Sequence, residues 1–129
     1  MKGILCLSLI CFVAISCRQS DELKGFDRRL WQSDPLGCQS KRVAQTESFL
    51  QVVKPYLLQN SLGEMQVRAL LGKADAIEIA ERGMKFYRYY LTRGRQCLGD
   101  TSGIAGQYIQ IRFNALNQVN EVALIISNL

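Results

Sequence analysis

The chain has 129 residues, a length typical of one domain. Its 16 Lys and Arg residues against 11 Asp and Glu residues give a formal charge of +5, and 48% of its residues are hydrophobic, which argues against a disordered or fibrous chain. The chain contains no histidine, so the usual general base and the commonest metal ligand are absent. We therefore expect no catalytic residues, no metal site and no cofactor.

The N-terminus has the features of an export signal. Lys2 precedes an apolar run at 4–15, long enough for a signal peptide but shorter than the roughly 20 residues of a membrane-spanning helix. The run ends in Val13-Ala14-Ile15-Ser16-Cys17, which resembles the lipobox of bacterial lipoproteins. This resemblance implies that residues 1–16 are a signal peptide and that Cys17 is acylated after cleavage. An uncleaved anchor or an ordinary secretory signal is the alternative.

The residues after Cys17 are polar, so we expect 17–25 to be a lipidated flexible tether and 26–129 to be the folded domain. Each buried methylene contributes about 0.8 kcal/mol, so several acyl chains would hold the protein firmly at a bilayer. In lipoprotein sorting, an aspartate after the cysteine favours the inner membrane. Arg18 occupies that position, which favours an outer-membrane location facing the periplasm.

The cysteines divide into groups with different expected fates. Cys6 and Cys11 lie in the signal segment and Cys17 takes the lipid, which leaves Cys38 and Cys97. An even remainder in an oxidising compartment usually pairs, so we predict a structural disulfide. It would close a loop of about 60 residues and stabilise the fold by roughly 4 kcal/mol in the chain-entropy model. Two thiols without histidine make a poor zinc site, and the C-x-x-C redox motif is absent.

The first segment of the domain, 26–38, shows no sustained periodicity. Asp34-Pro35 is typical of a turn. We expect Phe26, Leu30 and Trp31 to attach this segment to the core. For Trp31, a binding role is the alternative to packing.

A first helix is predicted at 42–54, because apolar residues follow it with helical spacing on one face. Pro55 should kink or end this helix, since its ring removes a donor and crowds the preceding turn. The apolar stripe consists of Phe49, Leu50, Val53, Tyr56 and Leu57.

A second, short helix is predicted at 64–71. Gly63 is the expected N-cap, Gln66 occupies the capping-box position, and Gly72 should end the helix. Leu62 and Val67 can pack together across the N-cap. The expected buried side consists of Met65, Val67, Leu70 and Leu71.

The remaining sequence alternates with the period of a β-strand. Strands are predicted at 77–81, 84–93, 107–114 and 119–126, with Arg82-Gly83 as the first turn. Two N-terminal helices followed by three or four antiparallel strands predict an α+β fold, with the helices packed on one face of the sheet.

The run Leu62-Gly63-Glu64-Met65-Gln66-Val67-Arg68-Ala69-Leu70-Leu71-Gly72-Lys73-Ala74-Asp75 resembles the second-helix signature of the SmpA/OmlA (BamE-like) lipoproteins. The segments 86–90 and 109–113 resemble strands of that family, and the resemblance extends from about residue 50 to the C-terminus. It implies the helix-helix-sheet fold and a role as a small accessory protein in outer-membrane β-barrel assembly. Gly63 replaces the family's usual Ser or Thr and Ala74 its usual Pro, and the matching positions define a scaffold without identifying a site.

The sheet face away from the helices is the candidate interaction surface. If Ile109, Ile111 and Phe113 face the helices, the intervening residues face outward. On the preceding strand, 84–93, we expect Arg88 to face outward, because burying an unpaired arginine would be costly. Arg and Tyr are enriched at protein interfaces, although a solvated face without function is the alternative. The predicted surface consists of Arg88, Tyr90, Tyr108, Gln110 and Arg112.

Loss of the signal segment would leave 15 basic and 11 acidic residues, a charge of +4. Lys85, Arg88, Arg93 and Arg95 would form a basic patch for anionic lipid or an acidic partner, or else be scattered solubilising charges. Nucleic acid is a poor partner for an exported lipoprotein.

The sequence shows no catalytic motif, since neither remaining cysteine has a histidine partner and no serine lies in G-x-S-x-G. We therefore expect a non-enzymatic, lipid-anchored interaction or scaffolding protein of the cell envelope. Its partners would be the membrane and an envelope or outer-membrane assembly protein. A tethered ligand-binding or inhibitor-type module is the second hypothesis, and a hydrolase is the third.

Overall fold

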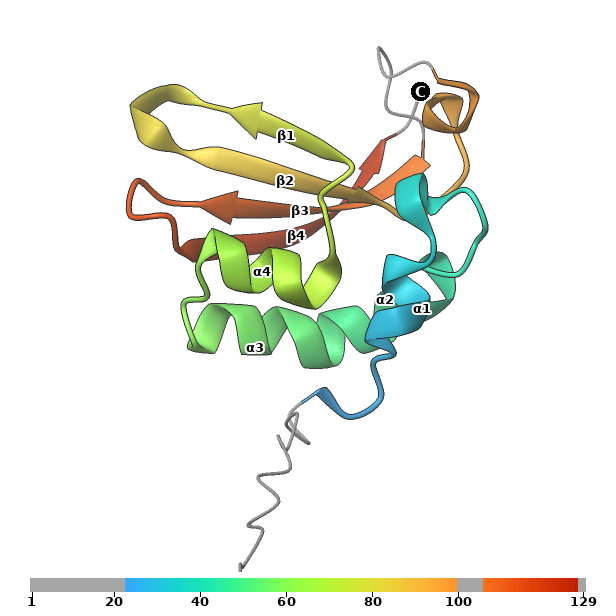
Figure 1. Cartoon of the computed structure of the whole chain (residues 1–129), viewed down its shortest axis with the longest axis horizontal. Coiled ribbons are helices and arrows are strands. Elements are labelled where there is room, and N and C mark those ends of the chain that lie inside the picture. Colours follow the sequence, from blue (N-terminus) through green and yellow to red (C-terminus); the bar gives the residue numbers. More distant parts are fainter. Residues whose placement is uncertain (1–22, 100–105, 128–129) are drawn as a thin grey trace, which may run out of the picture.

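The computed structural model describes residues 23–99 and 106–127, and the statements below concern these residues. They form an α+β fold in which helices lie below a four-stranded antiparallel sheet (Figure 1). The predicted α+β class with an antiparallel sheet is confirmed. The predicted signal segment 1–16 and the acylation site Cys17 lie outside the described residues. No helix in the described part of the chain is long and apolar enough to cross a membrane.

The structure contains a short helix, α1 (Arg28–Gln32), where no regular element was predicted. The Asp27 carboxylate caps it by accepting a hydrogen bond from the Leu30 N–H at 3.0 Å. Trp31 is fully buried and stacks on Phe49 with ring centroids 4.9 Å apart, so its packing role is confirmed. Leu30 is 38% exposed, and its predicted role as an anchor is wrong, because so short a helix turns only one side to the core.

A continuous helical run of 17 residues follows, from Val43 to Gln59. The predicted end at Lys54 is therefore wrong. An α-helix would place the Pro55 ring against the carbonyl four residues earlier, but here a wider π-helical turn precedes the proline and the chain continues through it. The run consists of a 3-10 turn (Val43–Gln45), α2 (Thr46–Ser48), the π-helical turn (Phe49–Val53) and α3 (Lys54–Gln59).

The next helix, α4 (Glu64–Leu71), has the predicted bounds. Its N-cap is Gly63, whose N–H donates to the Gln66 side chain at 2.9 Å. Gly72 ends the helix with a φ of 81°, a left-handed value that glycine adopts without strain. The predicted capping residues are thus confirmed.

The buried side of α4 differs from the prediction at one residue. Val67, Leu70 and Leu71 are buried as expected, but Met65 is 85% exposed. Met65 precedes Val67 by two positions, which at about 100° per residue places it on the opposite side of the helix. The prediction that Met65 is buried is therefore wrong.

The sheet is a meander in which each strand pairs with the next along the chain. Its strands are β1 (Ala76–Ile79), β2 (Lys85–Tyr90), β3 (Gly106–Phe113) and β4 (Val119–Ser127). All four strands were predicted, although β1 and β2 end earlier than expected. The first turn falls at Arg82 and Gly83 as predicted, and both have positive φ.

The register decides which face of the sheet carries the helices. Tyr87 pairs with Ile111 and Tyr89 with Ile109, and all four are fully buried. Since side chains alternate along a strand, Arg88 points to the opposite face. The predicted outward orientation of this residue is confirmed.

Just before the start of β1, an ion pair covers the edge of β2. Arg42 and Asp75 lie 2.5 Å apart with side chains 2% and 4% exposed. The Asp75 carboxylate accepts hydrogen bonds from the N–H groups of Tyr90 (2.8 Å) and Leu36 (2.9 Å). The Arg42 guanidinium donates to the carbonyls of Trp31 (3.0 Å) and Tyr90 (3.3 Å). One buried pair thus joins the first segment, the α4–β1 connection and β2.

A second buried carboxylate holds Arg42 in place. Asp34 is fully buried and accepts hydrogen bonds from the N–H groups of Gln39 (2.7 Å), Lys41 (2.9 Å) and Arg42 (3.1 Å). The Arg42 guanidinium also lies 5.2 Å from the centroid of the Trp31 ring, a cation–π contact. The loop before the long helix is therefore ordered around these two side chains.

Replacing Arg42 with Met should destabilise the protein strongly, because Asp75 would remain as a buried carboxylate without its cation. Breaking a buried ion pair costs about 3–5 kcal/mol, and we expect the free energy of unfolding in urea to fall by that amount. The control Arg29→Met removes an exposed arginine and should change stability by less than about 0.5 kcal/mol. Equal stability of the two variants would contradict the role of the pair.

Candidate functional site

The predicted interaction residues lie together on the sheet face away from the helices, here called the outer face. Arg88 pairs with Gln110 across the two central strands, and Tyr90 pairs with Tyr108. Arg112 follows on β3, opposite Phe86. The outer face therefore contains all five predicted residues and, in addition, Phe86.

Arg88 is held by groups from the two neighbouring strands, β1 and β3. Its Nη2 lies 2.5 Å from Glu78 Oε2, and its Nε donates to Gln110 Oε1 at 3.2 Å. The guanidinium also lies 5.7 Å from the centroid of the Tyr108 ring. The Arg88 side chain is 23% exposed, so it is fixed in position while remaining accessible.

Arg112 is held in a similar way on the next strand. Its Nε donates to Asn120 Oδ1 at 3.1 Å, and its Nη2 lies 3.1 Å from Glu121 Oε2. The Arg112 side chain is 35% exposed. The partner carboxylates, Glu78 and Glu121, were missed by sequence reasoning, because identifying them requires the register of the edge strands.

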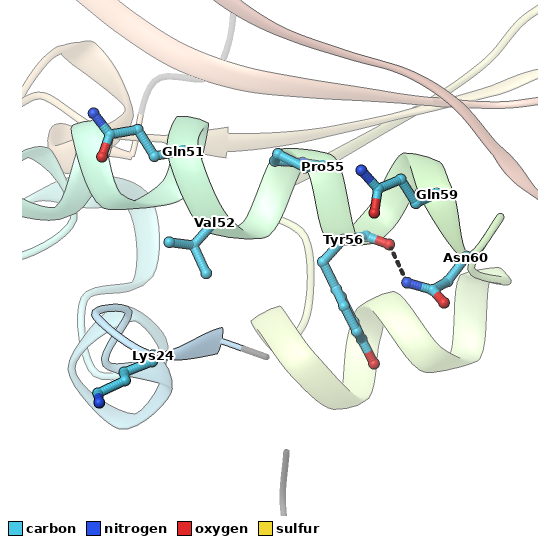
Figure 2. Close-up of a pocket in the computed structure, with 7 residues that line it drawn as sticks. All are labelled: Lys24, Gln51, Val52, Pro55, Tyr56, Gln59 and Asn60. Carbon is cyan, nitrogen blue, oxygen red and sulfur yellow. Dashed lines mark hydrogen bonds between the residues drawn. The ribbon is translucent and has the colours of Figure 1, made fainter. Parts of the chain in front are cut away.

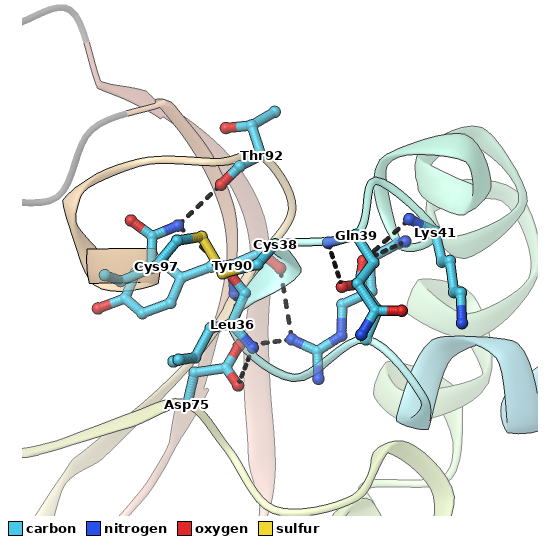
Figure 3. Close-up of a disulfide and its surroundings, with 11 residues drawn as sticks. Leu36, Cys38, Gln39, Lys41, Asp75, Tyr90, Thr92 and Cys97 are labelled. Atoms are coloured by element: carbon cyan, nitrogen blue, oxygen red, sulfur yellow. Dashed lines mark hydrogen bonds and ion pairs between the residues drawn. A yellow bond between two sulfur atoms is a disulfide. The ribbon is translucent and has the colours of Figure 1, made fainter. Parts of the chain in front are cut away.

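The two tyrosines contribute less exposed surface than expected. Tyr90 is 4% exposed and Tyr108 is 8% exposed, and their rings meet edge to face at 6.2 Å. Burial raises the pKa of the Tyr90 hydroxyl. Tyr90 lies beside the disulfide in Figure 3, so the first segment covers this end of the outer face. Of the five predicted residues, Arg88, Gln110 and Arg112 therefore remain accessible.

Cys38 and Cys97 form a disulfide with a Cα–Cα distance of 5.7 Å, which confirms the predicted pair (Figure 3). It joins the chain after the 3-10 turn Pro35–Gly37 to the short 3-10 helix Arg95–Leu98. The turn packs closely on β2, since a Cβ at Gly37 would lie 2.5 Å from the Tyr90 carbonyl oxygen. The disulfide therefore holds the first segment against the end of the sheet.

Of the two interpretations of the basic residues around β2, the structure favours scattered charges over one basic patch. Lys85 pairs with Phe113 in the register and so lies on the helix-facing side, whereas Arg88 lies on the outer face. Arg93 and Arg95 follow the end of β2 and lie near the disulfide. Lys85 therefore cannot share one surface with Arg88.

A separate cluster of hydrogen-bonded side chains joins the start of α4 to the sheet. The Glu64 carboxylate accepts hydrogen bonds from the Tyr87 hydroxyl and from the Lys85 ammonium, the latter at 3.0 Å. The hydrogen bond from Tyr87 and the nearby lysine lower the pKa of Glu64. Burial, followed by the hydrogen bond to Glu64, raises the pKa of Tyr87. The cluster holds α4 over β2.

A groove with a volume of about 510 Å³ lies beside the long helix (Figure 2). Carboxamide and apolar side chains dominate its lining, and Lys24 is the one lining residue that is charged at neutral pH. Within 23–99 and 106–127, no three His, Cys, Asp or Glu residues lie close enough to hold a metal ion. The groove is lined by Lys24, Gln51, Val52, Pro55, Tyr56, Gln59 and Asn60.

Comparison of the chain with protein-family profiles, with curated proteins and with solved structures yields no match. The functional argument therefore depends on the sequence motifs and on the geometry described above.

Removing the disulfide should lower stability, because the unfolded chain regains the freedom of the loop between Cys38 and Cys97. We expect the double variant C38S/C97S to lose about 2–4 kcal/mol in denaturant unfolding. A reducing agent should lower the stability of the unmodified protein by the same amount and leave the double variant unchanged. Identical melting of the oxidised and reduced protein would rule out a stabilising disulfide.

The stability contributed by Glu64 should depend on pH. Its pKa is lower in the folded protein than in the unfolded chain, so its contribution is present above the ordinary glutamate pKa and is lost as the pH falls through the folded value. We expect the stability difference between the unmodified protein and Glu64→Gln to shrink between pH 7 and pH values well below 4.5. Tyr87→Phe removes the main cause of the shift and should show the same trend. A difference that stays constant across this range would refute the assignment.

Proposed function

We propose that this protein is a non-enzymatic lipoprotein of the cell envelope that is anchored through acylated Cys17 and binds a partner protein with its outer face. The lipobox-like end of the apolar run supports the anchor. Leu23, the first described residue, lies six positions after Cys17, so the tether spans at most about 20 Å. The domain would therefore remain close to the membrane surface.

The observation that carries the proposed binding role is that the outer face is not covered by helices and holds two ordered, partly exposed arginines. The helices cover the opposite face of the sheet, and the outer face presents Arg88 and Arg112 in fixed positions with partly exposed guanidinium groups. Arginine is enriched among the residues that dominate binding energy at protein interfaces. Side chains that are already ordered lose little conformational entropy on binding, which favours this face as a contact surface.

The similarity of 62–75 to the SmpA/OmlA (BamE-like) signature supports a finer version of the proposal. The helix-helix-sheet order and the bounds of α4 are consistent with it. In this version the protein is attached to the outer membrane, faces the periplasm, and assists outer-membrane protein assembly. Its partner would be an envelope protein of that machinery.

A tethered ligand-binding module has less support. Small-molecule sites are usually concave and mostly apolar with a few convergent polar groups. The groove in Figure 2 is lined mainly by polar side chains of one helix. We therefore favour the outer face as the working surface.

A photocrosslinking amino acid at Gln110 tests the binding role, with the same substitution at Gln59 on α3 as the control. In intact cells we expect a discrete adduct with one envelope protein from position 110 and none from position 59. Mass spectrometry of the same membrane extract should show acyl groups on Cys17. Failure to form an adduct specific to position 110 would overturn the binding role, and a non-acylated Cys17 would overturn the anchor.

A further inference from the structure

We infer that the outer face binds an acidic, extended segment of the partner protein, whose carboxylates replace Glu78 and Glu121 on Arg88 and Arg112. The inference rests on the proposed function and specifies the chemistry of the partner. It follows from three features of the face: the spacing of the arginines, the way they are held, and the exposure of the carboxylates that now pair with them.

The spacing of the two arginines matches that of an extended chain. Arg88 pairs with Gln110 and Arg112 pairs with Phe86, so the arginines are diagonal neighbours on adjacent antiparallel strands. Such neighbours lie about 7–8 Å apart. Side chains two positions apart on one side of an extended segment are separated by about 6.7 Å. A segment with acidic residues at alternating positions can therefore reach both guanidinium groups.

Uncharged groups keep the arginines in place when their carboxylates leave. Gln110 accepts from Arg88 Nε, and the Tyr108 ring lies under the same guanidinium. Asn120 accepts from Arg112 Nε. Because these contacts use Nε or the face of the group, the terminal Nη atoms remain available to an incoming carboxylate.

The present carboxylate partners can be displaced at little cost. Glu78 and Glu121 are 53% and 50% exposed, and ion pairs at such exposed positions contribute little to stability. The buried pair of Arg42 and Asp75, with side chains 2% and 4% exposed, is the opposite case and is not exchangeable. The positive net charge of the chain also favours encounters with an acidic segment.

The test uses the full-length protein and a fluorescent eight-residue peptide of alternating Glu and Thr, with an alternating Gln and Thr peptide as the neutral control. Binding is measured by anisotropy at low and moderate salt. The double variant R88Q/R112Q should bind the acidic peptide about tenfold more weakly than the unmodified protein. R93Q/R95Q removes the same charge beyond the end of β2 and should weaken binding much less.

A second pair of variants should change the affinity for the acidic peptide in the opposite direction. E78Q/E121Q removes the internal competitors and should bind the acidic peptide severalfold more tightly than E47Q/E81Q, which changes the net charge equally. A gain in affinity cannot arise from misfolding, and the melting temperature of each variant provides a further check.

Equal losses in the two arginine variants, or no gain in E78Q/E121Q, would overturn the inference. The crosslink at position 110 separates this failure from that of the proposed function. If the adduct forms in cells and these charge variants leave its yield unchanged, the binding role stands and the acidic segment is wrong. If the peptide binds as expected and the adduct is absent, the proposed role in cells fails.

Discussion

The buried pair of Arg42 and Asp75 is the interaction on which the arrangement of this domain depends. β1 begins opposite Arg88 and does not extend alongside Tyr90, so the backbone N–H and carbonyl of Tyr90 would otherwise face a gap at the edge of β2. Unpaired buried backbone groups are costly, and the ion pair satisfies both. Because the same pair also holds Leu36 and Trp31, the position of the first segment depends on it.

Features encoded by local signals could be predicted from the sequence. The two glycines that flank α4 set its bounds, and alternating apolar residues identify the strands. The pair of Arg42 and Asp75 could not be predicted, since 33 positions separate the residues and neither belongs to a local motif. The passage of the helix through Pro55 depends on a π-helical turn, which leaves no periodic signal.

In the candidate site, too, features encoded by local sequence could be predicted, whereas contacts between distant residues could not. Strand alternation identified the arginines of the outer face, but not the groups that hold them. Glu121 pairs with Arg112 next to a shift in register between β3 and β4, and such a bulge cannot be read from an alternating pattern. The burial of Tyr90 and Tyr108 likewise results from tertiary packing and not from their own strands.

Amide hydrogen exchange of Leu36 and Tyr90 tests the central claim most directly, because both N–H groups donate to Asp75. If the ion pair joins the first segment to the sheet, both amides should exchange only through global unfolding, with the same free energy as the slowest amides of β2 and β3. Rapid exchange of Leu36 while the central strands stay protected would show that the first segment opens independently, and would contradict this account.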